Sequence, residues 1–127
     1  MKTADSFLAS CNMLMCGQSP RAILRRALQL IEEPQHWTPW ANALDVYGRR
    51  VRPQDPTAVC WSVEHAFSRA GGDHGIVPPY FMVLLDHVLL ERFNSLFSVT
   101  YFEQHRGHDE VKRLLMAAID AAPGEEA

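Results

Sequence analysis

The fold is decided by residues 79–93, which read PYFMVLLDHVLLERF. Pro79 suits the first turn of a helix, because the amide hydrogen that proline lacks would have no partner there. Apolar side chains then cover most of the circumference of the predicted helix, and the polar side chains form a narrow strip of Asp86, His87, Glu91 and Asn94. A helix that is apolar nearly all round belongs in the middle of a core. The segment therefore predicts a helical protein built around it.

Three further helices are predicted on either side of this segment. Two of them begin with a capping residue followed by proline, at Ser19-Pro20 and at Asp55-Pro56. Their apolar residues recur at three- and four-residue spacing, as they do in the last predicted helix. We expect these helices at residues 20–33, 56–70 and 109–121. Residues 95–106 carry strand-favouring side chains but lie between helices, so both strand and helix stay open for them.

The region between the first two helices has a different character. Residues 35–54 hold two tryptophans, two prolines and a Gly48 turn between short extended pieces, which predicts a small β-hairpin inside residues 40–53. The expected fold is mainly α, a compact bundle of about four helices with this hairpin between the first and the second. One domain is expected over residues 1–127, with residues 1–18 as a weakly ordered arm or short helix and residues 122–127 as a tail.

Composition limits the classes of function. The chain has 127 residues, with 12 Lys and Arg against 15 Asp and Glu, so its formal net charge is −3. This balance gives no overall attraction to nucleic acid. No apolar run approaches the roughly 20 residues of a membrane helix, so we expect no membrane partner. Three cysteines without CxxC spacing favour a reducing, cytoplasmic setting over a disulfide framework.

A set of short motifs resembles a domain-of-unknown-function family of small bacterial and phage proteins. The first half of the pattern is a tryptophan, an Ala-rich segment, a turn glycine, a Val-x-Pro and a Cys-Trp pair that precedes a small-residue helix. The second half is an asparagine, then a His-x-Glu-Val helix start and a Leu-Leu-x-x-Ala-Ile run. The matching residues are Trp37, Ala41, Ala43, Gly48, Val51 to Pro53, Ala58, Cys60, Trp61, Ala66, Asn94, His108, Glu110, Val111, Leu114, Leu115, Ala118 and Ile119. The resemblance implies the fold outline and a phage or mobile-element context, and it implies no activity.

The sequence offers candidate residues for two kinds of site, a cysteine nucleophile and a histidine metal site. Cys60-Trp61 near a helix start, with Gln54 upstream, resembles the order in papain-like cysteine proteases, and a helix amino end can stabilise a thiolate. The apolar arc beside Cys60, the like charge of Glu64 and the short chain that follows all oppose a nucleophile. The histidine pairs, His87 with Glu91 and His105 with His108, match no HExxH motif. We therefore expect no catalytic residue, metal or cofactor, and a small cysteine- or histidine-dependent hydrolase stays the alternative.

Arginines and aromatic residues suggest a binding surface. Arg49, Arg50 and Arg52 lie near Trp37, Trp40 and Tyr47, and Arg21, Arg25 and Arg26 could support them in a phosphate or nucleic-acid site. Trp61 and His65 lie on the predicted solvent face of their helix, where an exposed aromatic would suit a protein interface. Alternatively, the 36–53 loop covers Trp61 and makes a second small core.

These observations favour a small cytoplasmic, non-enzymatic binding or interaction module. The residues expected at its binding surface are Trp37, Trp40, Arg49, Arg50, Arg52, Trp61 and His65. The expected partner is another protein, and a phosphate or nucleic-acid ligand of the Arg49 to Arg52 cluster is the alternative.

Overall fold

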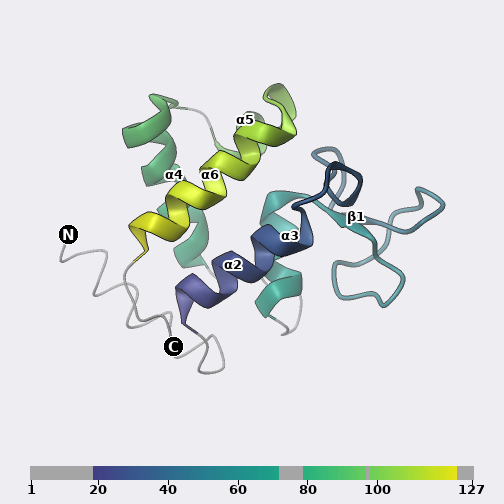
Figure 1. The fold of residues 1–127 in the computed structure, drawn as a ribbon. Helices are drawn as coiled ribbons and strands as arrows, with labels where there is room; N and C mark the ends of the chain where they lie inside the picture. Colours follow the sequence, from purple (N-terminus) through teal and green to yellow (C-terminus); the bar gives the residue numbers. More distant parts are fainter. Residues whose placement is uncertain (1–18, 72–78, 97, 123–127) are drawn as a thin grey trace.

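The structure is a computed structural model that describes residues 19–71, 79–96 and 98–122 (Figure 1). The proposed amino-terminal arm, residues 1–18, lies outside the described residues, as does the proposed tail except for its first residue, Ala122. In chain order, the elements are α2 Pro20–Leu30, η1 Pro34–His36, β1 Ala43–Leu44, β2 Cys60–Trp61, α3 Val63–Gly71, α4 Pro79–Phe93, α5 Val99–His105 and α6 His108–Ala121. A mainly α fold with a small antiparallel sheet between α2 and α3 is confirmed.

Helix α2 begins as its sequence predicts and ends earlier. The Ser19 side chain accepts a hydrogen bond from the Ala22 amide at 3.1 Å, and Pro20 occupies the first turn. Ile23, Leu24 and Ala27 are buried. The last helical residue is Leu30, because the Ile31 amide closes the helix on the Ala27 and Leu28 carbonyls and Pro34 opens the short 3-10 helix η1.

Helix α4 has the predicted bounds but not the predicted central position. It buries Phe81, Leu85 and Leu89, and the Phe81 ring stacks on that of Phe67 from α3 with centroids 4.8 Å apart. Val83 and Leu90, on the opposite side of the helix, are exposed. The helix therefore lies at one side of the bundle, packed on α5 and α6, and its apolar circumference exceeds what the core covers (Figure 1).

The open segment 95–106 contains a helix rather than a strand. Asn94 ends α4 with a φ of 52°, in the left-handed region that asparagine tolerates better than most residues. Ser98 then caps α5 by accepting a hydrogen bond from the Tyr101 amide at 3.2 Å. Phe102 of α5 packs edge-on against Phe93, with ring centroids 5.5 Å apart. The Ser98 cap and the contact of Phe102 with Phe93 thus favour a helix, where the amino-acid composition alone favoured neither helix nor strand.

The helix predicted from residue 56 begins only at Val63, which is a correction to its first two turns. Cys60 and Trp61 form β2, which pairs antiparallel with β1 in the register Ala43 to Trp61 and Leu44 to Cys60. The second strand therefore lies outside the predicted 40–53 range. The predicted range still contains a tight turn. After this turn, residues 49–51 pair with the side of β1 that faces away from β2, and the Val51 amide donates to the Ala43 carbonyl at 3.1 Å.

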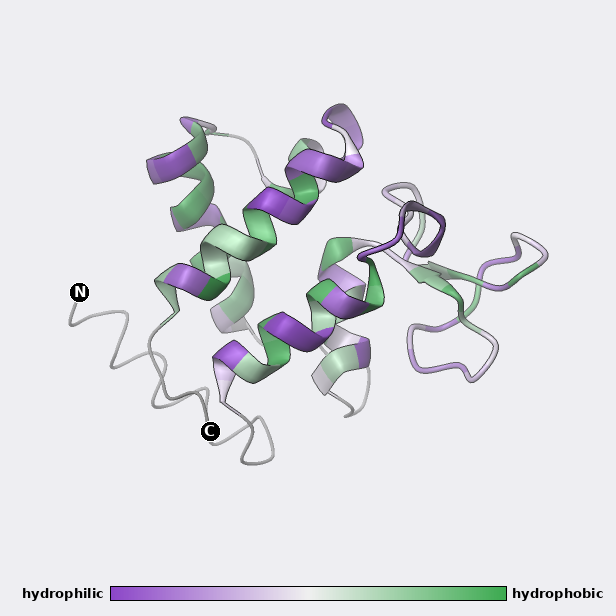
Figure 2. Cartoon of the chain, viewed as in Figure 1, coloured by the Kyte–Doolittle hydropathy of each residue, from purple (hydrophilic) through white to green (hydrophobic). Residues whose placement is uncertain are grey.

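One cluster of buried apolar residues joins all the helices from α2 to α6 and the strand residues Ala43 and Trp61. In Figure 2, the apolar green faces of the helices are turned toward one another, and polar purple residues alternate with them along α2 and α6. The loops around β1 project from the side of the body away from α4 (Figure 1). None of the described helices has the length and apolar character that crossing a membrane requires.

Candidate binding surface

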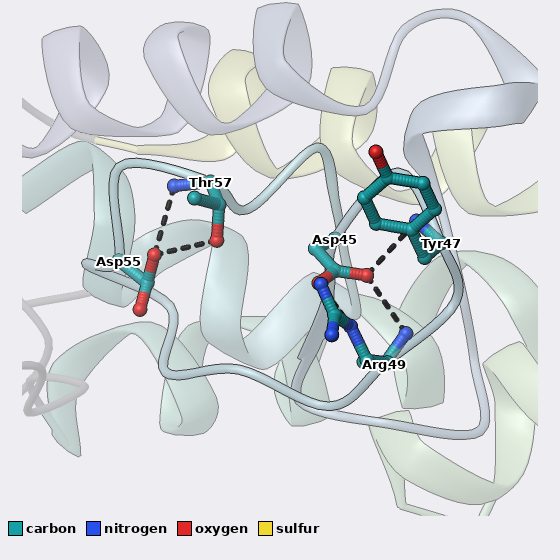
Figure 3. Close-up of polar contacts among 5 residues, drawn as sticks. All are labelled: Asp45, Tyr47, Arg49, Asp55 and Thr57. Carbon is teal, nitrogen blue, oxygen red and sulfur yellow. Dashed lines mark hydrogen bonds and ion pairs between the residues drawn. The ribbon is translucent and has the colours of Figure 1, made fainter.

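A tight turn at residues 45–49 is held by one carboxylate. The Asp45 side chain accepts hydrogen bonds from the Tyr47 amide at 2.9 Å, the Arg49 amide at 2.8 Å and Arg49 Nε at 3.0 Å (Figure 3). Gly48 closes the turn with a φ of 78°, a backbone conformation that side chains disfavour. The bond from the Arg49 amide, followed by those from its side chain and from Tyr47, lowers the pKa of Asp45. The carboxylate therefore stays ionised, and the turn is ordered.

This turn presents aromatic and cationic side chains to solvent. We call residues 40–52 the tip loop. Tyr47 is 78% exposed and Trp40 is 65% exposed, although large aromatic side chains are usually much more buried. The Arg49 guanidinium lies 5.0 Å from the centre of the Tyr47 ring, a cation–π distance. Arg50 and Arg52 are also exposed, and neither side chain has a polar partner among residues 19–71, 79–96 and 98–122.

Trp61 is not part of this surface, contrary to the expectation that it faces solvent. It is 5% exposed, and its indole nitrogen donates to the Pro53 carbonyl at 3.0 Å. Arg69 lies over the indole and donates to the carbonyls of Pro53 and Asp55 at 3.0 and 2.9 Å. Asp55 is itself fixed by hydrogen bonds from the Thr57 amide and hydroxyl (Figure 3). The alternative, in which the 36–53 loop covers Trp61, is closer to the structure, but Trp61 belongs to the same buried cluster as the helices and not to a second small core.

His65 is likewise engaged within the fold. Its Nδ1 lies 3.0 Å from the Ser62 hydroxyl at the start of α3, and the imidazole is half-buried. Desolvation lowers the pKa of His65, and the charge of Glu64 opposes this shift. The ring is therefore neutral near pH 7 and serves the start of α3 rather than the tip loop.

Trp37 joins a buried carboxyl group that the sequence analysis did not single out. Its indole nitrogen donates to Glu103 Oε2 at 2.8 Å, and the Val63 amide donates to the same oxygen at 3.1 Å. Glu103 is only 2% exposed. Desolvation raises its pKa to about 7, against the two hydrogen bonds. The sequence offers one sign of this burial, because Glu103 directly follows the apolar Phe102 and both lie on the side of α5 that faces the core.

Arg21 and Arg26 of α2 do not support the tip loop. Arg21 donates to the carbonyls of Ile119 and Ala122 at the carboxyl end of α6. Arg26 donates to the Ala70 carbonyl near the end of α3 at 3.2 Å. Such cations satisfy the last carbonyls of a helix and complement its dipole. Without Arg21 and Arg26, the predicted cluster depends on Arg49, Arg50 and Arg52, and Arg49 is already paired to Asp45.

The structure places Cys60 in a strand, not at a helix start. The thiol is buried, and desolvation raises its pKa, which favours the unreactive protonated form. The helix-assisted nucleophile considered above therefore has no support in this geometry. Among the histidines, His87 Nε2 lies 3.1 Å from a carboxylate oxygen of Glu91, one turn further along α4, and His105 stacks on Tyr101. Within the described parts of the chain, no three His, Cys, Asp or Glu side chains are grouped to hold a metal ion.

Comparison with known proteins gives one positive finding. No curated protein and no solved structure is significantly similar to the chain. The model of a family of unknown function, DUF6197, matches residues 15–121, which include every element described above. This range also contains the motifs by which the resemblance was drawn, from Trp37 to Ile119. The chain therefore belongs to the family of unknown function DUF6197.

Proposed function

We propose that this chain is a small, cytoplasmic, non-enzymatic module that binds another protein through its tip loop. The observation that carries the proposal is the ordered Asp45 to Arg49 turn, which holds Tyr47 in solvent against the Arg49 guanidinium, with the exposed Arg50 and Arg52 next along the chain. Tyrosine, tryptophan and arginine are the residues that most often dominate protein–protein binding energy. The sparse, unpatterned cysteines support the cytoplasmic setting, and the phage or mobile-element context stays a prediction of the resemblance.

Order in the free protein strengthens this interpretation. A flexible loop loses conformational freedom when it binds, and this loss reduces affinity. The tip loop has already lost much of that freedom, because both ends of the turn are bonded to Asp45 and to β1. The backbone that carries its exposed aromatic side chains is thus fixed, although these side chains do not pack in the buried core. We take binding to be the reason that this loop is ordered.

A phosphate or nucleic-acid ligand is the second candidate, favoured by the exposed Arg50 and Arg52. Arginine binds phosphate well, but sequence-independent binding to nucleic acid depends on the number of phosphates neutralised. With Arg21, Arg26 and Arg69 donating to backbone carbonyls, few cations are left to follow a phosphate chain. A protein partner fits the mixture of aromatic and cationic groups better.

The test is affinity capture with the full chain as bait and quantitative comparison of variants. The tip variant carries Trp40→Ser and Tyr47→Ser, and the matched control carries Val83→Ser and Leu90→Ser on α4, where the apolar side chains are also exposed, though somewhat less, and distant from the tip loop. We expect a partner that the wild type and the α4 control capture and the tip variant loses. Circular dichroism confirms that each variant is folded.

Nuclease treatment of the lysate separates the two candidates. A partner that persists after nuclease digestion supports protein binding, whereas its loss indicates that nucleic acid bridges the complex. Full retention of the partners by the tip variant would show that the binding surface lies elsewhere.

A further inference from the structure

The tip loop contains an open edge of the small sheet. Strand β1 is paired on one side with β2 and on the other with residues 49–51. The amide of Val51 donates to the Ala43 carbonyl at 3.1 Å, and the Asp45 amide donates to the Arg49 carbonyl at 2.9 Å. Residues 49 and 51 therefore direct their backbone groups toward β1. No described element pairs with the opposite side of this segment.

Arg50 is the residue whose backbone faces outward at this edge. In an antiparallel ladder, successive residues direct their N–H and C=O groups to opposite sides of the strand. Since Arg49 and Val51 bond to β1, the N–H and C=O of Arg50 point away from it. Among the described residues, neither group makes a hydrogen bond. This is a donor and an acceptor in the geometry that an added strand requires.

The side chains along this edge give it a charge. Arg50 and Arg52 are exposed, and Val51 between them packs against the core. Alternation along an extended chain puts residues 50 and 52 on the same face. Their spacing matches that of two side chains on one face of a neighbouring strand, two residues apart. The edge therefore combines an open backbone site with two cations in register.

We propose that an extended, acidic segment of a partner protein pairs with residues 49–52 as an added strand, with carboxylates two residues apart against Arg50 and Arg52. This inference rests on the proposed function and specifies the partner that the tip loop fits. Backbone pairing supplies affinity in such complexes, and side chains on alternate positions supply specificity. Carboxylates with arginine form strong, charge-assisted hydrogen bonds.

Other occupants of this edge fit less well. A second copy of the chain would bring its own Arg50 and Arg52 against the same two residues, and like charges across a strand pair are destabilising. A nucleic acid has no backbone amide to pair with the Arg50 carbonyl. Its bases would also compete with Arg49 for the Tyr47 ring, which the guanidinium already approaches. An acidic peptide strand satisfies both the backbone groups and the cations.

The experiment titrates the full chain with a fluorescent peptide of alternating glutamate and valine at low ionic strength. Two modified peptides carry N-methyl groups, one on all the glutamate amides and one on all the valine amides. A paired strand uses only one alternate set of amides toward its neighbour. We expect one modified peptide to lose binding and the other to retain it. The double variant Arg50→Glu with Arg52→Glu reverses the charge of the edge and should lower the affinity for the parent peptide by about tenfold or more. Arg113→Glu on α6 should leave this affinity unchanged.

Hydrogen exchange gives a second readout on the wild type, because the Arg50 amide should become protected when the parent peptide binds. Equal binding of both N-methyl peptides would overturn strand pairing and indicate binding by charge alone. Absence of binding by the parent peptide, or its displacement by an equimolar single-stranded oligonucleotide, would overturn the proposal as well. None of these results affects the proposed function, which is judged by a captured partner that depends on Trp40 and Tyr47.

Discussion

Glu103 is the residue whose ionisation couples most strongly to the fold. Its carboxyl group connects three parts of the chain, because α5 carries it, Trp37 follows η1 and Val63 begins α3. Burial disfavours the carboxylate, and the nearby charge of Glu64 adds to this effect. The two hydrogen bonds favour the carboxylate but do not outweigh desolvation. The result is a buried acid that titrates in the neutral range.

The pKa of Glu103 predicts a pH dependence of stability. In the folded protein it is about 7, above the ordinary glutamate value of 4.5. The folded state thus binds more protons than the unfolded state between these values, so the free energy of unfolding should fall as pH rises through them. The shift corresponds to roughly 3 kcal/mol in total, present below pH 4.5 and lost above pH 7.

Urea unfolding of the wild type and Glu103→Gln over this pH range measures the effect. Glutamine resembles the protonated acid, so the variant should lose this part of the pH dependence and be the more stable form above pH 7. Glu110→Gln, which removes an ion pair with Arg106 on the surface, is the control and should keep the wild-type slope. A slope in Glu103→Gln equal to that of the wild type would show that another group causes the dependence.

Among the elements, the turn at residues 45–49 depends on the backbone of Gly48. Its φ of 78° strains any residue with a Cβ, and no atom lies within 4 Å of a Cβ placed there, so the cost of a side chain is purely conformational. Gly48→Ala should destabilise the turn by about 1 kcal/mol, and Gly48→Asn by less. We expect hydrogen exchange at the Arg49 amide to be fastest in Gly48→Ala, slower in Gly48→Asn and slowest in the wild type. Equal exchange in all three would mean that Asp45 alone orders the turn.

The segment over Trp61 depends on Arg69 of α3. Its guanidinium donates to two carbonyls and lies over the indole. Arg69→Ala should lower the free energy of unfolding by roughly 1–3 kcal/mol, because both carbonyls lose a charged donor. Urea unfolding measures the loss, and a red shift of tryptophan emission should accompany it. Arg113→Ala, on the exposed side of α6, is the control with little expected effect.

The same elements explain which predictions from sequence succeeded. The bounds of α4 and the start of α2 follow from local caps and prolines, which sequence shows directly. Asp55-Pro56 carried the same signal, yet Asp55 bonds to Thr57 in a turn and the next four residues lead into β2. That strand exists because β1 lies beside it, a pairing between distant residues that periodicity does not reveal. Of the predicted surface, the tip loop arginines and Trp40 are exposed, whereas the burial of Trp61 depends on Pro53 and Arg69.

At the scale of the whole molecule, the structure divides the arginines into two groups. Most of those on the helical body are engaged, with Arg21 and Arg26 donating to carbonyls near helix ends and Arg106 paired with Glu110, whereas Arg113 is exposed on α6. The tip loop carries two exposed cations, Arg50 and Arg52, whose side chains have no polar partner among the described residues, and Arg49, which is shared with Asp45. The formal net charge of −3 therefore conceals a local positive region opposite α4 (Figure 1). This region suits a partner with a small acidic site.

This arrangement predicts how the protein responds to a polyanion. Binding to a single-stranded oligonucleotide releases counterions in proportion to the phosphates that cations neutralise, with a slope of log affinity against log salt of about −0.7 per phosphate. Two or three tip-loop arginines therefore limit the slope to about −2. Fluorescence anisotropy of a labelled oligothymidine over a range of NaCl concentrations measures it, and Arg50→Glu with Arg52→Glu should abolish the binding. A slope near −4 or steeper would require cations from the helical body, such as the exposed Arg113 of α6, or Arg21 and Arg26 released from their carbonyl bonds.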